Sequence, residues 1–484
     1  MTSLNHRRGW DRHQTLLLPE RLEDYIAADN PVRFLDAFAA RLDLRALGFA
    51  KATVQDTGRP PYDPADLLRL YLYGYLQRVR SARRLEAECH RNLEGLWLLG
   101  KLAPDHKTIA DFRKDNLKAL QGVTRQFTLL CQKLELFGGP LAGIDGTKLC
   151  AVNRKDANFN EKKLPELLAR ADARSAEYLA QLDQADRAEP PNPAPAKAAL
   201  EAKLAALREK KEWPEALRGQ LDEADKPISV TDPDARKLRT RNGFVVGFNA
   251  QTAVDAQHKL IAAAAVTHEE TDGPQLANVA RQTQENLGVA KLEVVADKGC
   301  YRNPEVSRCL ERGLTPDLEK ADPSANTQQG LFGKSKFHYD AAKAVYVCPA
   351  GKELTPRFNT EAKGRPLRYD RAVDCRNCAL KQQGPRNQAN RTITREEDEG
   401  LLEAMAARVA AQPEKMQLRK PRCEHPFGTI KRWFGYSYFL VKGLEKVRCE
   451  WHLMTLAYNL KRGLNLVSFE KLMAAVGVKL PQSA

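Results

Sequence analysis

Apolar residues recur every three or four positions through the first third of the chain, which is the spacing of one face of a helix. The pattern predicts a helix over 64–76, which a proline opens. Ser81 is suited to cap a second helix that runs to residue 96, and Asp105 to cap a third over 106–114. We therefore expect an all-helical block here, arranged either as a small bundle or as a helix-turn-helix with basic flanks.

Strand-like patterns replace the helical spacing after residue 136. Residues 140–145 and 292–297 are short apolar runs that each end in an aspartate, and 148–152 continues the first run. Residues 243–254 and 259–266 are close enough to pair as a hairpin. Helical periodicity between and after these strands predicts helices over 272–287, 303–312 and 397–411. The alternation indicates a mixed α/β domain with helices flanking its sheet.

Two further segments interrupt this domain. Residues 157–226 carry a near-heptad apolar stripe on both sides of a proline-rich joint, which predicts a helical-hairpin insertion that stiffens the scaffold, mediates dimerisation or clasps DNA. Residues 325–411 combine short strands with cysteines and predict a small β-rich insertion. The remaining expected parts are a basic tail at 1–20, a helical N-terminal domain at 21–136, the α/β domain at 137–156, 227–324 and 412–465, and a C-terminal tail at 466–484.

The stretch 420–435 has two distinct faces if it is wound as a helix at 100° per residue. One face carries Glu424, Gly428, Lys431 and Gly435, and its neighbour carries Phe427, Ile430 and Phe434. Pro426 would lie in the first turn, where proline is tolerated. The arrangement fits an acid that holds a metal and a base that holds a phosphate, or an ordinary amphipathic helix with a surface ion pair.

The charge of the chain favours a polyanionic partner. The formal net charge is +15 over 484 residues, and 415–462 contains eleven Lys and Arg against three Glu. This excess is a patch, which points to nucleic acid. No run approaches the ~18 apolar residues of a membrane span, and the first residues lack a signal-peptide core, so we expect a cytoplasmic, nucleoid-associated protein with no membrane partner.

Two strands that end in aspartate and one later helix with a glutamate suggest a metal site. Phosphodiester cleavage requires an activated nucleophile and a stabilised leaving oxygen, which two Mg²⁺ ions provide. Asp145, Asp297 and Glu424 are the candidate ligands, although a single aspartate at a strand end is more often a turn or cap residue. We expect Asp272 to cap the helix that follows it.

Four sequence blocks carry a family resemblance. They are Ile144-Asp-Gly-Thr-Lys148, Val266-Thr-His-Glu-Glu-Thr-Asp272, Ala296-Asp-Lys-Gly-Cys-Tyr301 and Glu424-His-Pro-Phe-Gly-Thr-Ile-Lys431. These blocks resemble those of bacterial insertion-sequence transposases of the Asp-Asp-Glu (DDE) type. The resemblance extends over most of the chain, and the last block is the most specific because the glutamate and the lysine seven residues later both match.

The resemblance implies a ribonuclease-H-like catalytic domain in which Asp145, Asp297 and Glu424 hold Mg²⁺, for which Mn²⁺ can substitute. It implies DNA as the partner, both as terminal inverted repeats and as target, with strand cleavage, strand transfer and a homodimer. The expected DNA contacts are Lys431, Arg432, Lys420, Arg419, Arg422, Lys148 and Lys298. The alternatives are a nuclease or resolvase of the same fold without strand transfer, and a DNA-binding relic without catalysis.

The chain departs from the family pattern in two places. Many relatives carry Tyr and Arg at the positions of Gln417 and Lys420, which leaves open which basic residue reaches the scissile phosphate. The cysteine-containing segment resembles a metal knuckle. Cys348, Cys375 and Cys378 are its candidate Zn²⁺ ligands, and the fourth expected cysteine is absent unless His338 serves instead.

Aromatic residues follow the last block among basic ones. Trp433, Tyr436 and Tyr438 are candidates for stacking on unpaired bases, whereas Phe434 and Phe439 are expected in the core.

Overall fold

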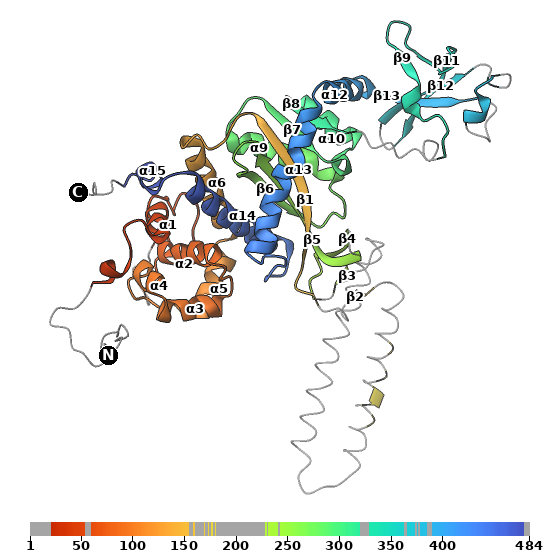
Figure 1. Cartoon of the computed structure of the whole chain (residues 1–484). Coiled ribbons are helices and arrows are strands. Elements are labelled where there is room, and N and C mark those ends of the chain that lie inside the picture. Colours follow the sequence, from red (N-terminus) through yellow and green to blue (C-terminus); the bar gives the residue numbers. More distant parts are fainter. Residues whose placement is uncertain are drawn as a thin grey trace, which may run out of the picture. The chain divides into compact units, whose positions relative to one another are not determined.

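The chain folds into two compact units in the computed structural model (Figure 1). One comprises residues 1–126 and 456–484, and the other comprises residues 127–455. Most of the predicted arm at 157–226 and the basic tail at 1–20 lie outside the described residues. The structure describes residues 21–53, 60–153, 158–159, 228–229, 231–240, 243–319, 329–362, 365–372, 378–384 and 390–478, together with a few single positions.

The first unit is helical, as the apolar spacing predicts. Asp105 caps its helix by accepting hydrogen bonds from the backbone N–H groups of Lys107 and Thr108, at 2.9 and 3.0 Å. The single helix predicted after Ser81 is wrong, because Asn92 is extended, ends one helix and caps the next. The elements are η1 (Leu22–Tyr25), α1 (Pro31–Ala40), α2 (Pro64–Leu76), α3 (Ala82–Arg91), α4 (Leu93–Leu98), α5 (His106–Asp115), α15 (Phe469–Ala475), and parts of α6 (Leu117–Lys133) and α14 (Leu444–Leu466).

The second unit is built on a mixed sheet. Its central strand β1 (Leu141–Cys150) pairs antiparallel with β5 (Gly243–Asp255) on one side and parallel with β7 (Leu292–Ala296) on the other. Beyond β5 lies β6 (Ile261–Thr267), which confirms the predicted hairpin, and beyond β7 lies β8 (Leu314–Leu318). Short strands β2 (Asn158–Phe159), β3 (Ile228–Ser229) and β4 (Arg236–Thr240) extend the same sheet.

The order of the main strands defines the fold. Three consecutive antiparallel strands (β1, β5 and β6) are followed by two strands (β7 and β8) that run parallel to β1 on its other side. Helix α9 (Leu276–Leu287) connects β6 to β7, and α10 (Asn303–Glu311) connects β7 to β8. This is the ribonuclease-H-like arrangement expected for the α/β domain.

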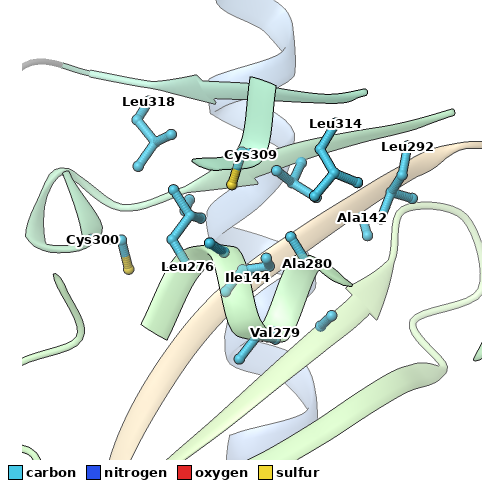
Figure 2. Packing of buried hydrophobic residues seen from close by; sticks show 14 of the residues in the cluster. Ala142, Ile144, Leu276, Val279, Ala280, Leu292, Cys300, Cys309, Leu314 and Leu318 are labelled. Carbon is cyan, nitrogen blue, oxygen red and sulfur yellow. The ribbon is translucent and has the colours of Figure 1, made fainter. Parts of the chain in front are cut away.

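The core of this unit lies between the sheet and its connecting helices. Strand residues such as Ala142 and Ile144 pack against Leu276 and Val279 of α9, and all four are at most 1% exposed (Figure 2). Helix α12 (Glu399–Ala411) adds Leu402 and Met405 to the same cluster. Because side chains alternate along a strand, the neighbours of Ala142 and Ile144 face the opposite side of β1.

Helix α13 (Pro413–Gly428) contacts β1, β5 and β7 and passes across the sheet in Figure 1. Pro426 lies inside this helix and not in its first turn, so that expectation was wrong. The helix continues as a π-helical segment, η7 (Thr429–Trp433). Gly435 lies beyond this segment and has a positive φ of +75°. The π-helix changes the angle between successive side chains, so the predicted polar stripe does not extend to Gly435.

The β-rich insertion forms a second sheet in the order β13-β12-β11-β10-β9. Its small core consists of Tyr346, Leu354, Ala372 and Ile393. The strands are β9 (His338–Asp340), β10 (Val345–Val347), β11 (Glu353–Ala362), β12 (Arg365–Ala372) and β13 (Thr392–Glu396). None of the helices in the described part of the chain is both long and apolar enough to cross a membrane.

Candidate active site

The register of two parallel strands brings Asp145 and Asp297 together. Ile144 of β1 pairs with Ala296, the last residue of β7. Each aspartate is the next residue along its chain, so the two occupy adjacent positions at the carboxyl end of β7. Strand geometry therefore fixes both Cα atoms without help from a loop.

Arg419 of α13 faces both carboxylates. One guanidinium nitrogen lies 3.7 Å from Asp145 Oδ2, and the other lies 3.5 Å from Asp297 Oδ1. The side chains are 15% exposed for Arg419, 22% for Asp145 and 51% for Asp297. The arginine thus provides a positive charge to the two acids on a partly buried surface.

Burial sets the protonation behaviour of Asp145. It raises the pKa of this carboxyl to about 6, against the lowering effect of the Gly146 backbone N–H and of Arg419. The N–H donates to Asp145 Oδ1 at 2.8 Å. The negative charges of Asp272 and Asp297 raise the pKa further. A carboxylate that is poorly solvated and close to other anions attracts a cation strongly.

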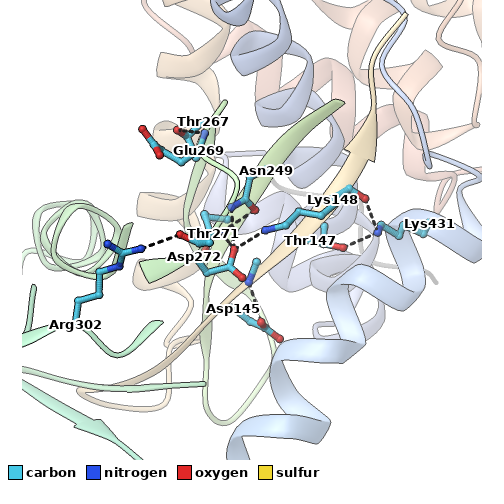
Figure 3. A network of polar contacts seen from close by, with 12 residues as sticks. Asp145, Thr147, Lys148, Asn249, Thr267, Glu269, Thr271, Asp272, Arg302 and Lys431 are labelled. Atoms are coloured by element: carbon cyan, nitrogen blue, oxygen red, sulfur yellow. Dashed lines mark hydrogen bonds and ion pairs between the residues drawn. The ribbon is translucent and has the colours of Figure 1, made fainter. Parts of the chain in front are cut away.

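The opposite face of β1 carries a second polar network (Figure 3). Asp272 Oδ1 accepts hydrogen bonds from the Lys148 ammonium at 2.9 Å, from the Asn249 amide at 2.8 Å and from the Gln251 amide at 2.6 Å. Gly146 lies against this network. A Cβ atom there would approach Gln251 Nε2 to 2.2 Å and Asp272 Oδ1 to 2.4 Å, which explains the glycine after Asp145.

The cap role predicted for Asp272 is wrong. Its side chain makes no capping hydrogen bond to the helix that follows, because its carboxylate oxygen serves the donors from β1 and β5. Burial alone would raise the pKa of Asp272. The Lys148 ammonium and the amides of Asn249 and Gln251 outweigh burial and hold the pKa below its ordinary value.

Two lysines attach α13 and its π-helical extension to the sheet. Near its start, Lys415 Nζ lies 2.7 Å from Glu293 of β7. In η7, Lys431 donates to the Thr147 hydroxyl and, at 2.9 Å, to the Lys148 carbonyl (Figure 3). Burial lowers the pKa of Lys431. Its ammonium is therefore engaged by β1 in this structure, and its predicted contact with DNA stays a prediction.

Glu424 lies on α13 directly after Cys423, whose buried thiol rests against Gly143 of β1. Glu424 itself is exposed. Within the described residues, no three Asp, Glu, His or Cys side chains lie close enough together to share a metal ion. The structure thus unites Asp145 and Asp297 but does not add Glu424 to them.

The two aspartates fit a divalent cation. Carboxylate oxygens are the protein ligands that Mg²⁺ prefers, and a cationic group, that of Arg419, already faces both of them. Asp145, Asp297 and Glu424 stay the predicted set of ligands, with the first two in position.

Comparisons with known proteins agree with this site. Residues 20–115 match the family described as Transposase domain (DUF772), and residues 347–464 match the Transposase DDE domain, a segment that contains Glu424 and Lys431. The chain is a DDE-type transposase.

The transposase is also similar to a solved structure titled "Cryo-EM structure of piggyBac transposase synaptic complex with hairpin DNA (SNHP)". The identity is 10%, the match covers 93% of this chain and 77% of that one, and the TM-score is 0.32. No curated protein matches the chain.

Other basic residues of the transposase are presented to solvent around the site. Lys298 follows Asp297, Lys420 follows Arg419, and Arg432 lies in η7; all three are exposed, and Arg422 is partly exposed. Their predicted contacts with DNA stay predictions.

The aromatic residues after Lys431 divide into two groups. Tyr436 is 1% exposed and belongs to the core, as do Phe434 and Phe439, at 3% and 1%. Trp433 and Tyr438 are exposed at 42% and 47%, and their predicted stacking on unpaired bases stays a prediction.

The three cysteines of the insertion line one cavity of about 60 Å³. Cys348 lies there with Cys375 and Cys378, next to Lys381 and Arg391. The exposed His338 does not form a metal cluster with them among the residues that the structure describes. The zinc interpretation stays a prediction.

Asn249 and Gln251 are site residues that the sequence analysis missed. Both are fully buried in β5, at 0% exposure, and both donate to Asp272. Two amides at alternate positions of a largely apolar strand were a usable signal, because buried amides need partners.

Proposed function

We propose that this transposase binds the terminal inverted repeats of an insertion sequence, cuts DNA beside them and joins the new 3′ hydroxyl to a target phosphodiester. The observation that carries the proposal is the pair Asp145–Asp297, two carboxylates at adjacent strand positions facing one cationic group. The transposase families matched at 20–115 and 347–464 support the same activity.

Asp145, Asp297 and Glu424 would hold Mg²⁺, and Mn²⁺ would substitute for it. Divalent cations supply a Lewis acid for the phosphodiester and lower the pKa of a bound water. The protein contributes rigidity: two ligands are set by β1 and β7, and α13, which carries the third, is attached to β7 through Lys415.

DNA would be held by the basic residues that surround the pair. Three of them are exposed and directly follow predicted site residues along the chain: Lys298, Lys420 and Arg432. At these positions they can contact phosphate oxygens. Arg422 and Lys431 would join them. Two element ends must be brought together, so the active form would be a homodimer on DNA, and such work would place the protein at the nucleoid in the cytoplasm.

The test is to incubate the protein with Mg²⁺ and oligonucleotides that carry the repeats flanking its reading frame. Joined products would support the proposal. Cleavage without joining would identify a nuclease or resolvase, and a gel shift without cleavage would identify a relic; either result rejects strand transfer.

Substitutions assign the acids. Asp297→Asn and Glu424→Gln should each abolish cutting while DNA binding persists, whereas Glu414→Gln, an exposed acid in the first turn of the same helix, should cut as the unmodified protein does. If Glu424→Gln still cuts, the third ligand is another residue.

A further inference from the structure

Arg419 lies where the divalent cation of the proposed active site would have to bind. Its two terminal nitrogens are 3.7 Å from Asp145 and 3.5 Å from Asp297. A bound Mg²⁺ lies about 2.0–2.1 Å from its carboxylate ligands. An ion at that distance from the same oxygens would leave a guanidinium within a few ångströms of a second, stronger positive charge.

The charges of the site indicate what the arginine does before the ion arrives. Asp145 and Asp297 occupy adjacent positions on neighbouring strands, and Asp145 is only 22% exposed, so the two carboxylates would repel one another if no cation faced them. Lys148 already neutralises Asp272 on the other face of β1. Arg419 is the cation that faces the remaining two acids.

The position of Arg419 on α13 is set by contacts other than its own. Lys415 attaches the start of the helix to Glu293, and Cys423 packs against Gly143. The helix therefore remains in place if the Arg419 side chain moves, and a long arginine side chain can turn toward solvent from a fixed backbone.

We propose that Arg419 is an exchangeable counter-ion of the active site: it holds Asp145 and Asp297 together without metal, is displaced when a divalent cation binds, and then takes a phosphate oxygen of the bound DNA. The proposal rests on the proposed function and adds a coupling between metal binding and DNA binding. One positive charge moves from the carboxylates to the phosphate backbone as the metal enters. Arginine suits this role because its planar fork matches both carboxylate and phosphate oxygens.

The first experiment measures metal affinity without DNA, by titrating the full chain with Mn²⁺ and following the electron paramagnetic resonance of the free ion. Arg419→Gln should bind Mn²⁺ more tightly, on the order of tenfold, because the ion no longer displaces a charge-assisted contact. Arg419→Lys should bind nearly as the unmodified protein does. Lys420→Gln, which removes the neighbouring solvent-facing charge, should leave the affinity unchanged.

Thermal unfolding provides a second readout. In EDTA, Arg419→Gln should melt below the unmodified protein because two carboxylates then face each other alone. Its melting temperature should rise more on addition of Mg²⁺. Unchanged or weaker Mn²⁺ binding by Arg419→Gln would overturn the proposal, and so would an Asp145→Asn variant that keeps full Mn²⁺ affinity.

The DNA step is tested by the salt dependence of binding to repeat oligonucleotides. With Ca²⁺ present, the slope of log K against log salt for Arg419→Gln should be smaller in magnitude by about 0.9, the loss of one phosphate contact. In EDTA the two proteins should have the same slope. An equal difference in EDTA would show that Arg419 contacts DNA regardless of metal. The Mn²⁺ titration contains no DNA, so it remains informative even if the protein fails to cut or join repeats.

Discussion

Asp145→Asn should make the metal-free protein more stable at neutral pH. Burial raises the pKa of Asp145 from its usual value of about 4 to about 6. At neutral pH the folded protein therefore holds this carboxyl ionised, although folding favours its protonated form. Each tenfold change in acidity corresponds to about 1.4 kcal/mol, which sets the destabilisation by the ionised carboxylate at about 3 kcal/mol. An asparagine removes this charge and keeps an oxygen for the Gly146 N–H. Because its new amide meets Arg419, we expect a gain of about 1–3 kcal/mol.

The gain depends on pH in a defined direction. The carboxylate destabilises the folded state fully above pH ~6, progressively less as the folded protein takes up a proton between ~6 and ~4, and not at all below ~4. Guanidinium denaturation in EDTA at pH 7.5, 5 and 4 measures it. Asp297→Asn is the control, because Asp297 is 51% exposed and its removal should change stability by less than about 0.5 kcal/mol. A variant at Asp145 that is no more stable at pH 7.5, or whose gain is independent of pH, would refute the reasoning.

Two further substitutions test the scaffold around the site. Asp272→Ala should lower the free energy of unfolding by about 2–3 kcal/mol, since it removes the acceptor of the Lys148 ammonium and of the Asn249 amide and leaves the Gln251 amide only Asn249 Oδ1. Glu269→Ala, an exposed neighbour, is the control, and equal denaturation midpoints for the two would contradict the network. Gly143→Ala should cost about 1–3 kcal/mol because its Cβ would lie 2.4 Å from Cys423 Sγ, and Cys423→Ala in the same chain should restore most of that loss. Losses that simply add in the double variant would show that the two residues do not touch.

The strand framework of the site could be predicted from the sequence because its determinants are local. The apolar runs that end at Asp145 and Asp297 are visible as residues in order, and parallel pairing of such strands places their ends together. The burial of Phe427, Ile430 and Phe434 likewise follows from spacing alone.

The features of the site that the sequence did not predict depend mainly on contacts between distant segments. The residues next to Asp272 in sequence favour a helix cap, yet its carboxylate accepts hydrogen bonds from three donors on β1 and β5. The spacing of residues along the sequence does not predict these contacts. Arg419 was one of several basic residues in the patch, and only the approach of α13 to β1 and β7 singles it out. The π-helical turn at 429–433 depends on a change of backbone hydrogen bonding that a fixed 100° rotation excludes.

The first compact unit is assembled from two segments that lie far apart in the sequence, residues 1–126 and 456–484. Helix α15, with Leu472 and Met473 buried, packs on α1, which was synthesised more than four hundred residues earlier. At roughly 5–20 residues per second, a ribosome takes about 20 to 90 seconds to make the intervening segment. During that interval the early helices lack a partner for part of their apolar surface. Nascent chains of this protein should therefore need chaperone protection until α15 has been synthesised, and copies shortened by a stop codon before α15 should be degraded and not accumulate as a folded amino-terminal fragment.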